Sequence, residues 1–211
     1  MSATILDARS SVYRLLADLY ARELSGEQLS SFINGNGQEL LGALDTVPEC
    51  AAIVAHLNRS FGSIDDPQQA VLDFAESYAW NFHGVGGPGS PSLYASTYLS
   101  KTRSTHQETE SELRKIMTAH GLHSVNSDDV PYDHLSIILE FVAWLDEKGA
   151  HAEPDEVRQK VIDQYLLSWL PAFVSLVSFA SSTLKRAFFI PRLTSSSFVF
   201  PLRRLAARDL F

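Results

Sequence analysis

Apolar residues recur at helical spacing along most of the chain. Near the N-terminus they fall at positions i, i+3, i+4, i+7 and i+8, which form one face of an amphipathic helix. The members of this first stripe are Val12, Leu15, Leu16, Leu19 and Tyr20. A second stripe follows Asp66-Pro67-Gln68-Gln69, which supplies a cap, a first-turn proline and a capping-box glutamine. Its members are Val71, Phe74, Ala75, Tyr78 and Phe82. A short helix is also predicted over 48–61.

The second half of the chain predicts three longer helices. One starts near Thr105, with Glu108 completing a capping box, and stops at Gly121. Residues 131–145 are apolar on every side, which is typical of a central buried helix. A third begins at 153–155, and its apolar side consists of Val157, Val161, Tyr165 and Trp169. The serine- and arginine-rich tail predicts only a short helix over 202–208.

No stretch alternates as a strand would, so the fold class predicted is all-α. We expect a bundle of about nine to ten helices. Residues 122–130 are polar, and they are predicted to be a hinge between two lobes. The predicted N-terminal helical lobe covers 1–121 and the C-terminal helical lobe covers 131–211, acting as one functional unit.

Composition narrows the class of protein. The chain has 211 residues, of which 45% are hydrophobic, enough for a sizeable core. Its one cysteine excludes an internal disulfide and a multi-cysteine metal site. No apolar run reaches the roughly 18 residues of a membrane span. The first residues lack the pattern of a secretory signal. These features predict a cytoplasmic protein that does not enter a membrane.

The charge is unevenly distributed. The net charge is −8, but six of the 17 basic residues lie within 181–211. The first 180 residues therefore hold 11 basic against 24 acidic residues, a net charge of −13. Such a surface repels nucleic acid and anionic membranes, and it attracts cationic partners.

A glycine-rich loop matches a nucleotide-binding motif in sequence but lacks the structural context that the motif requires. Residues 84–89 fit G-x-G-x-x-G, but a predicted helix rather than a strand precedes them. Pro88 lacks an amide N–H, and Ser90 stands where a phosphate-binding loop has lysine. A nucleotide-dependent enzyme remains an alternative that tight, stoichiometric nucleotide binding would favour.

The other candidate groups do not combine into a catalytic or metal site. His120 and His123 are three residues apart, but Gly121 between them is expected to end the helix. Cys50 lies in an apolar helical segment, which predicts a buried and inert thiol. Asp133 and His134 are adjacent, so on a helix they point about 100° apart. We expect Asp133 in the first turn of its helix and His134 to be partly buried. The sequence therefore predicts that the chain is not an enzyme.

Two segments in order carry a family resemblance. The first runs from an aromatic helix end at 76–82, through the glycine loop, to a segment with Pro91, Tyr94 and Ser96. The second is Pro-Tyr-Asp-His-Leu at 131–135, which runs on to Glu140 and Phe141. Together with the N-terminal stripe, they resemble the TorD/DmsD/NarJ family of redox-enzyme maturation chaperones, and its TorD branch most. The resemblance covers roughly residues 5–175, and the chain departs from it after about 180.

This resemblance implies an all-helical cytoplasmic chaperone without catalytic activity, cofactor or metal of its own. Family members bind the apo-form of a molybdoenzyme and its twin-arginine signal peptide. They assist cofactor insertion before export. The expected client is trimethylamine N-oxide reductase, with dimethyl sulfoxide reductase as a related case. Weak guanine-nucleotide binding and homodimers formed by helix exchange are also attributed to the family. A helical adaptor for an unrelated partner is the alternative function.

The resemblance also implies a client-binding site. Five residues map onto signature positions of the family: Tyr94, Ser96, Pro131, Asp133 and His134. A twin-arginine signal is a basic segment followed by an apolar helix, so its partner needs acidic residues beside an apolar groove.

Our hypothesis is that Asp133 and nearby acids meet the arginines, while Phe82, Tyr94 and Phe141 line the groove. The alternative is that Tyr94 and Ser96 only anchor the glycine loop to the core.

Overall fold

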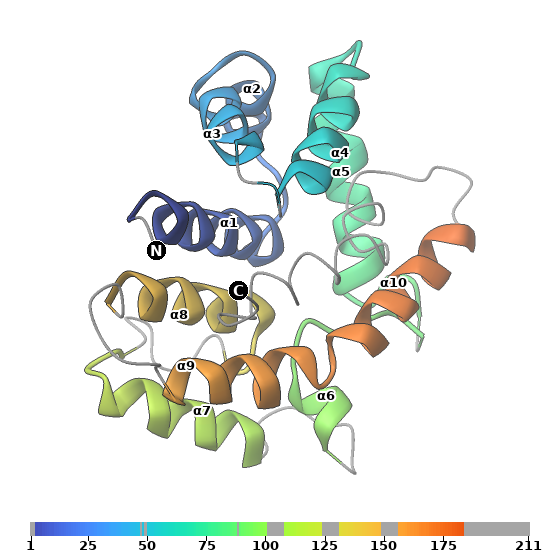
Figure 1. Cartoon of the computed structure of the whole chain (residues 1–211). Helices are drawn as coiled ribbons and strands as arrows, with labels where there is room; N and C mark the ends of the chain where they lie inside the picture. The colour runs from blue at the N-terminus through green and yellow to red at the C-terminus, as the bar shows by residue number, and fades with distance from the viewer. Residues whose placement is uncertain are drawn as a thin grey trace.

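The computed structural model describes residues 3–46, 48, 50–87, 89–100, 108–123, 131–148 and 156–183. Within these ranges the chain is helical, with one isolated β-bridge and no strand, so the all-α prediction is confirmed (Figure 1). Most of the predicted hinge, the start of the helix near Thr105 and the 202–208 helix lie outside the described residues. The division into two lobes stays a prediction.

The N-terminal part of the chain forms five helices within the described ranges. They are α1 (Ala3–Ala21), α2 (Gly26–Asn34), α3 (Asn36–Asp45), α4 (Ala51–Gly62) and α5 (Pro67–Phe82). The predicted cap of α5 is present, because Asp66 accepts the backbone N–H groups of Gln68 and Gln69. The short α2 and α3 are not predicted by the apolar pattern. A capping box between Ser25 and Gln28 starts α2.

The later helices are less regular. They are α6 (Ser96–Leu99), α7 (Glu108–Ala119), α8 (Leu135–Lys148), α9 (Glu156–Lys160), the π-helical segment η2 (Val161–Leu167) and α10 (Leu170–Thr183). The end of α7 agrees with the prediction, because Gly121 has a φ of 76° just after it. The wide turns of η2 were not predicted. Cys50 is buried as expected, but it precedes α4 rather than lying within it.

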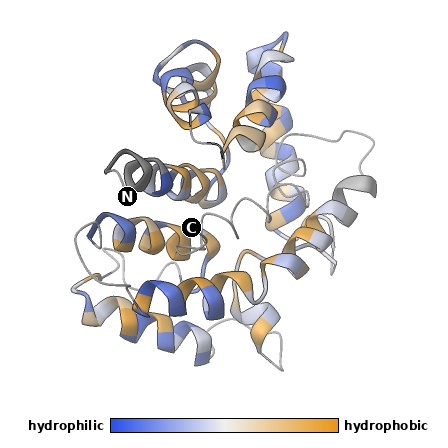
Figure 2. Cartoon of the chain, viewed as in Figure 1, coloured by the Kyte–Doolittle hydropathy of each residue, from blue (hydrophilic) through white to orange (hydrophobic). Residues whose placement is uncertain are grey.

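The core joins the N-terminal helix to a helix from the second half of the chain. Helices α1 and α8 lie side by side and form the most extensive contact between elements (Figure 1). All members of the first apolar stripe are buried, as are most residues of α8. Figure 2 shows hydrophobic residues along one side of most helices and hydrophilic residues along the other. One buried cluster therefore runs through both predicted lobes.

A buried ion pair connects α8 to α9. The Arg158 guanidinium donates to the carboxylate of Asp146, and both side chains are almost fully inaccessible to water. Removing either partner would leave an uncompensated charge in the protein interior, which strongly destabilises the fold. The pair therefore fixes how α9 meets the central helix.

One segment of the described chain is long and apolar enough to cross a membrane. It runs from Glu156 to Ser178 and includes η2. Half of its most apolar window is buried inside the protein. Tyr165, Trp169 and Phe173 within it belong to the hydrophobic core. Packing in the core therefore accounts for part of its apolar character.

Candidate functional site

The two sequence motifs meet in the fold. The backbone N–H of Leu135 donates to the Leu93 carbonyl at 2.8 Å, and the N–H of Ala95 donates to the Asp133 carbonyl at 3.0 Å. Tyr94 and His134 form the isolated antiparallel bridge between these hydrogen bonds. Four of the predicted site residues, Tyr94, Ser96, Asp133 and His134, are thus brought together from segments about 40 residues apart.

Asp133 does not lie in the first turn of a helix, so that prediction is wrong. Helix α8 begins at Leu135 rather than near Pro131, because the backbone before it pairs with residues 93–95. The Asp133 side chain is 0% exposed, and its Oδ2 accepts the backbone N–H of Ser96 at 2.9 Å. This contact holds the start of α6 against the second motif. A direct contact of Asp133 with a client arginine stays a prediction.

His134 is a buried, uncharged side chain in this arrangement. It is 7% exposed, and its ring lies edge-on to Tyr94 with centroids 5.0 Å apart. Its Nδ1 is 2.7 Å from the Ser136 hydroxyl. Burial lowers the pKa of His134 to about 4, so the imidazole is neutral near pH 7. Burial also raises the pKa of Tyr94, with a smaller contribution from the Asp133 carboxylate.

The other three predicted site residues lie in different places. Pro131 is buried just before the bridge. Phe82 belongs to a separate aromatic cluster, where its ring stacks on Phe173 with centroids 6.0 Å apart. Phe141 stacks near Trp144, with centroids 6.1 Å apart, on the side of α8 that faces a surface groove.

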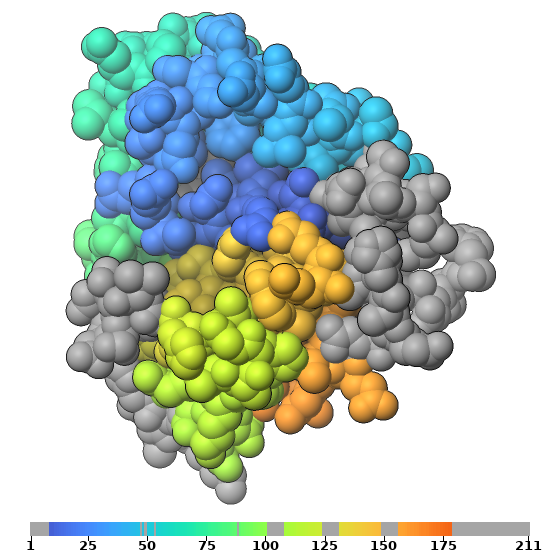
Figure 3. Space-filling view, turned by 90° about the vertical axis from the view of Figure 1, so that its left-hand side faces the viewer, coloured from blue at the N-terminus to red at the C-terminus, as the bar shows by residue number. Residues whose placement is uncertain are grey.

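This groove has a volume of about 450 Å³ and lies between α1, α8 and the end of α7. In Figure 3 the recess between α1 (dark blue) and α7 (yellow-green) is floored by yellow residues of α8. We call it the α1–α8 groove. Its lining is mostly apolar and consists of Ala17, Asp18, Ala21, Met117, Leu122, His123, Tyr132, Ser136, Ile137, Glu140, Phe141 and Trp144.

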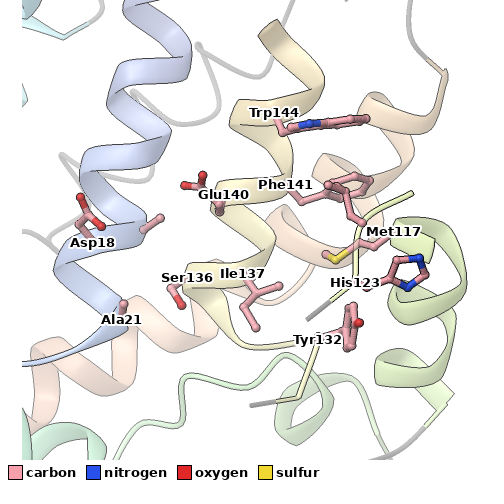
Figure 4. A pocket seen from close by; sticks show the side chains of 12 residues that line it. Asp18, Ala21, Met117, His123, Tyr132, Ser136, Ile137, Glu140, Phe141 and Trp144 are labelled. Carbon is pink, nitrogen blue, oxygen red and sulfur yellow. The ribbon is translucent and has the colours of Figure 1, made fainter. Parts of the chain in front are cut away.

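The two acidic groups of the groove lie along one side, and His123 lies on the other (Figure 4). Figure 4 shows the carboxylates of Asp18 and Glu140 on the α1 side, and the rings of Tyr132, Phe141 and Trp144 farther across. Both acids are exposed to solvent. An apolar recess edged by two carboxylates suits a ligand that is apolar along its body and cationic at one place.

The motif bridge adjoins one end of the groove. Tyr132 and Ser136, which line the groove, directly flank the Asp133-His134 pair. The hydrogen bond between His134 and Ser136 joins the two features. The bridge therefore positions groove residues, although its own side chains are largely buried.

The sequence motifs include Glu140, but they do not identify Asp18 or Trp144 as groove residues. The helical spacing of the apolar residues around Trp144 could have indicated its position. Ile137, Phe141 and Trp144 fall at i, i+4 and i+7 on α8, so they share one face. Opposite them, the small side chains of Ala17 and Ala21 leave room on α1. These two sets of residues form a groove only because α1 packs against α8 in the tertiary fold.

The glycine loop has the predicted connection to a preceding helix, α5. Gly84 and Gly87 have φ values of 74° and 90°, which explains glycine at these turns. At Gly86 a Cβ atom would lie 2.8 Å from the Trp80 carbonyl oxygen, so the loop folds back closely on α5. In the part of the chain that the structure describes, no group of three or more metal-binding side chains occurs.

Comparison with known proteins identifies the family. The model of the nitrate reductase delta subunit family matches residues 45–175, which is more than half of the chain. This stretch contains α4 to α9, both motifs and most of the groove residues of α7 and α8. The chain belongs to this family of all-helical proteins.

The relatives place it in the TorD branch, as predicted. The chaperone protein TorD of Shewanella loihica is 30% identical over 176 residues, which is 81% of each chain. TorD of Vibrio cholerae serotype O1 is 26% identical over 79% of this chain and 78% of its own. TorD of Aliivibrio salmonicida is 25% identical over 82% and 83%. These relatives are named chaperones.

Proposed function

We propose that this chain is a cytoplasmic chaperone that binds the apo-form of a molybdoenzyme and its twin-arginine signal peptide. The expected client is trimethylamine N-oxide reductase. Membership in the family and similarity to chaperones named TorD support the general function. The α1–α8 groove supports the mode of binding. In this proposal the chain assists cofactor insertion before export and has no catalytic activity of its own.

The observation that carries the proposal is the pairing of an apolar groove with two carboxylates. A twin-arginine signal has adjacent guanidinium groups followed by an apolar helix. The carboxylates of Asp18 and Glu140 would accept hydrogen bonds from the guanidinium groups, while the half-buried Ile137 and Trp144 would contact the apolar turns. The net negative charge of the chain would speed the encounter.

We assign different roles to the two parts of the site. Asp18 and Glu140 would contact the peptide, because their exposed carboxylates line the open groove. Phe141 is 2% exposed, so it would contribute to the base of the groove. Asp133 and His134 would position the neighbouring Tyr132 and Ser136, because their own side chains are buried.

Calorimetric titration with a twin-arginine signal peptide and its twin-lysine variant tests this function. We expect micromolar binding that weakens with lysine and with added salt, because guanidinium groups bind carboxylates in a bidentate way. Glu140→Gln should weaken binding, whereas Glu39→Gln, an exposed acid on α3, should leave it unchanged. Absence of heat with both peptides would contradict signal-peptide binding.

The client is tested separately by purifying the reductase from cells with and without this chain. A client that contains less molybdenum cofactor without the chain supports a role in cofactor insertion. Equal cofactor content would contradict that role. Cofactor-free reductase that lacks its signal peptide can also be passed over this chain immobilised on a resin. Retention would show that the chain binds the apo-form independently of the signal peptide.

A further inference from the structure

An arginine of the protein contacts one of the two acids that line the α1–α8 groove. Arg14 lies one turn before Asp18 on α1. Its Nε donates to Glu147 Oε1 at 3.0 Å, and its Nη2 donates to Glu147 Oε2 at 2.9 Å. Its remaining Nη1 contacts Glu140 Oε1. One guanidinium therefore bridges two carboxylates of α8, and one of these belongs to the groove.

The pair with Glu147 is the stronger of the two contacts. It has the parallel two-bond geometry that guanidinium and carboxylate groups prefer. The hydrogen bond from Arg14 lowers the pKa of Glu147, while that carboxylate raises the pKa of Arg14. Glu140 receives a single donor, so a second guanidinium could replace that donor while Arg14 stays on Glu147.

All three groups are accessible to a partner. The side chains of Arg14, Glu140 and Glu147 are 41%, 50% and 43% exposed. Ion pairs with this much solvent contact are weak and exchange readily. The contact between Arg14 and Glu140 can therefore break without opening the core.

The charges along this edge favour a cationic partner. Asp18, Glu140 and Glu147 supply three carboxylates, and Arg14 neutralises one of them. Lys148 is a second cation nearby, with its ammonium 5.7 Å from the centroid of the Trp144 ring. The carboxylates of Asp18 and Glu140 both line the groove, where arginines of a client would reach them.

We propose that Arg14 is an internal competitor for Glu140, and that it lowers the affinity of the groove for cationic segments. This inference rests on the proposed function. A client arginine displaces Nη1 of Arg14 from Glu140 because it can form two parallel hydrogen bonds there. A lysine forms only a point contact with Glu140 and binds it less tightly. Displacing Arg14 costs the same free energy for either ligand, so Arg14 lowers both affinities by the same factor.

The experiment compares wild-type protein with Arg14→Gln in the two peptide titrations. We expect Arg14→Gln to bind the twin-arginine peptide about two- to fivefold more tightly, the range expected for removing one exposed ion pair. The twin-lysine peptide should gain by a similar factor, because the same contact no longer has to be displaced. Arg59→Gln removes the same charge from α4, away from the groove, and should leave both affinities unchanged.

A double substitution separates competition from a general effect of charge. In a Glu140→Gln background, Arg14→Gln should give no gain, because the contested carboxylate is absent. A gain that persists there, an equal gain in Arg59→Gln, or an Arg14→Gln protein that binds no more tightly than wild type would each overturn the proposal.

Two further results complete the test. Arg14→Lys keeps the charge but loses the guanidinium that reaches both carboxylates, so tighter peptide binding by this variant supports competition even if Arg14→Gln folds poorly. An unchanged affinity in Arg14→Lys opposes it. Wild-type protein that binds neither peptide would contradict the proposed function and this inference with it. Wild-type binding without an effect of Arg14 would contradict the inference alone.

Discussion

His134 shows how burial controls a single titratable side chain. Its pKa of about 4 lies below the ordinary value of 6.5, because the charged ring would lose water. In the unfolded chain the ring takes up a proton as pH falls below 6.5, whereas in the folded chain it stays neutral until about pH 4. The unfolded state therefore binds more protons in this window, and stability is lost as pH falls through it.

We predict that the loss of stability attributable to His134 reaches about 3 kcal/mol at pH 4. His134→Gln should remove this part of the pH dependence, because glutamine does not titrate. Urea unfolding at several pH values between 4 and 7 measures it. His123→Gln, at an exposed position, should keep the wild-type profile. Parallel profiles for wild type and His134→Gln would show that the ring is not buried in solution.

The connection between α8 and α9 depends on the buried pair of Asp146 and Arg158. Asp146→Ala removes the carboxylate from a buried guanidinium, and we expect it to cost about 3–5 kcal/mol of unfolding free energy. Glu156→Ala removes an exposed acid from α9 and should cost much less. Thermal and denaturant unfolding of both variants measures the two losses of unfolding free energy for comparison. A loss below 1 kcal/mol in Asp146→Ala would mean that the pair is solvated.

The groove between α1 and α8 exists because α1 has small residues where it faces α8. We predict that Ala21→Phe fills part of this space and weakens binding of the twin-arginine peptide at least about tenfold, a loss of about 1.4 kcal/mol. Folding should be unaffected, since Ala21 is exposed at the end of α1. Ala52→Phe, at an exposed position on α4, is the matched control. Undiminished affinity in Ala21→Phe would place the peptide elsewhere.

Local chemistry explains which elements could be predicted from the sequence. The start of α5 follows from the cap at Asp66 and the proline after it, and the end of α7 follows from Gly121. The start of α8 was predicted too early, because hydrogen bonds to residues 93–95 decide it. Such pairing between distant segments leaves no periodic signal. The π-helical η2 has the same apolar spacing as an α-helix over its short length, so it was also missed.

The candidate site was predictable only in part, for a related reason. The family resemblance identified Tyr94 and His134, and the structure brings them together. It did not identify Asp18, because α1 and α8 meet only through the tertiary fold. A groove whose walls are far apart in the sequence requires the packing of the whole molecule to be known.

The whole molecule is expected to unfold as one unit. The buried cluster includes residues of α1, α5, α8 and α10, which lie on both sides of the predicted hinge in the sequence. Cooperative loss of a shared core gives a single transition. We predict coincident urea transitions by far-ultraviolet circular dichroism and tryptophan fluorescence. Two separate transitions would instead support lobes that are stable independently.

The packing of α1 against α8 also has a consequence for biosynthesis. Arg14 and Glu147 are 133 residues apart, so the ribosome makes one side of the groove long before the other. Contacts of such long range form late, because a large loop must close first. During translation the apolar face of α1 remains without its final cover until α8 has emerged. In the proposed mode of binding, a nascent chain therefore cannot hold a client in this groove until α8 has emerged and packed against α1.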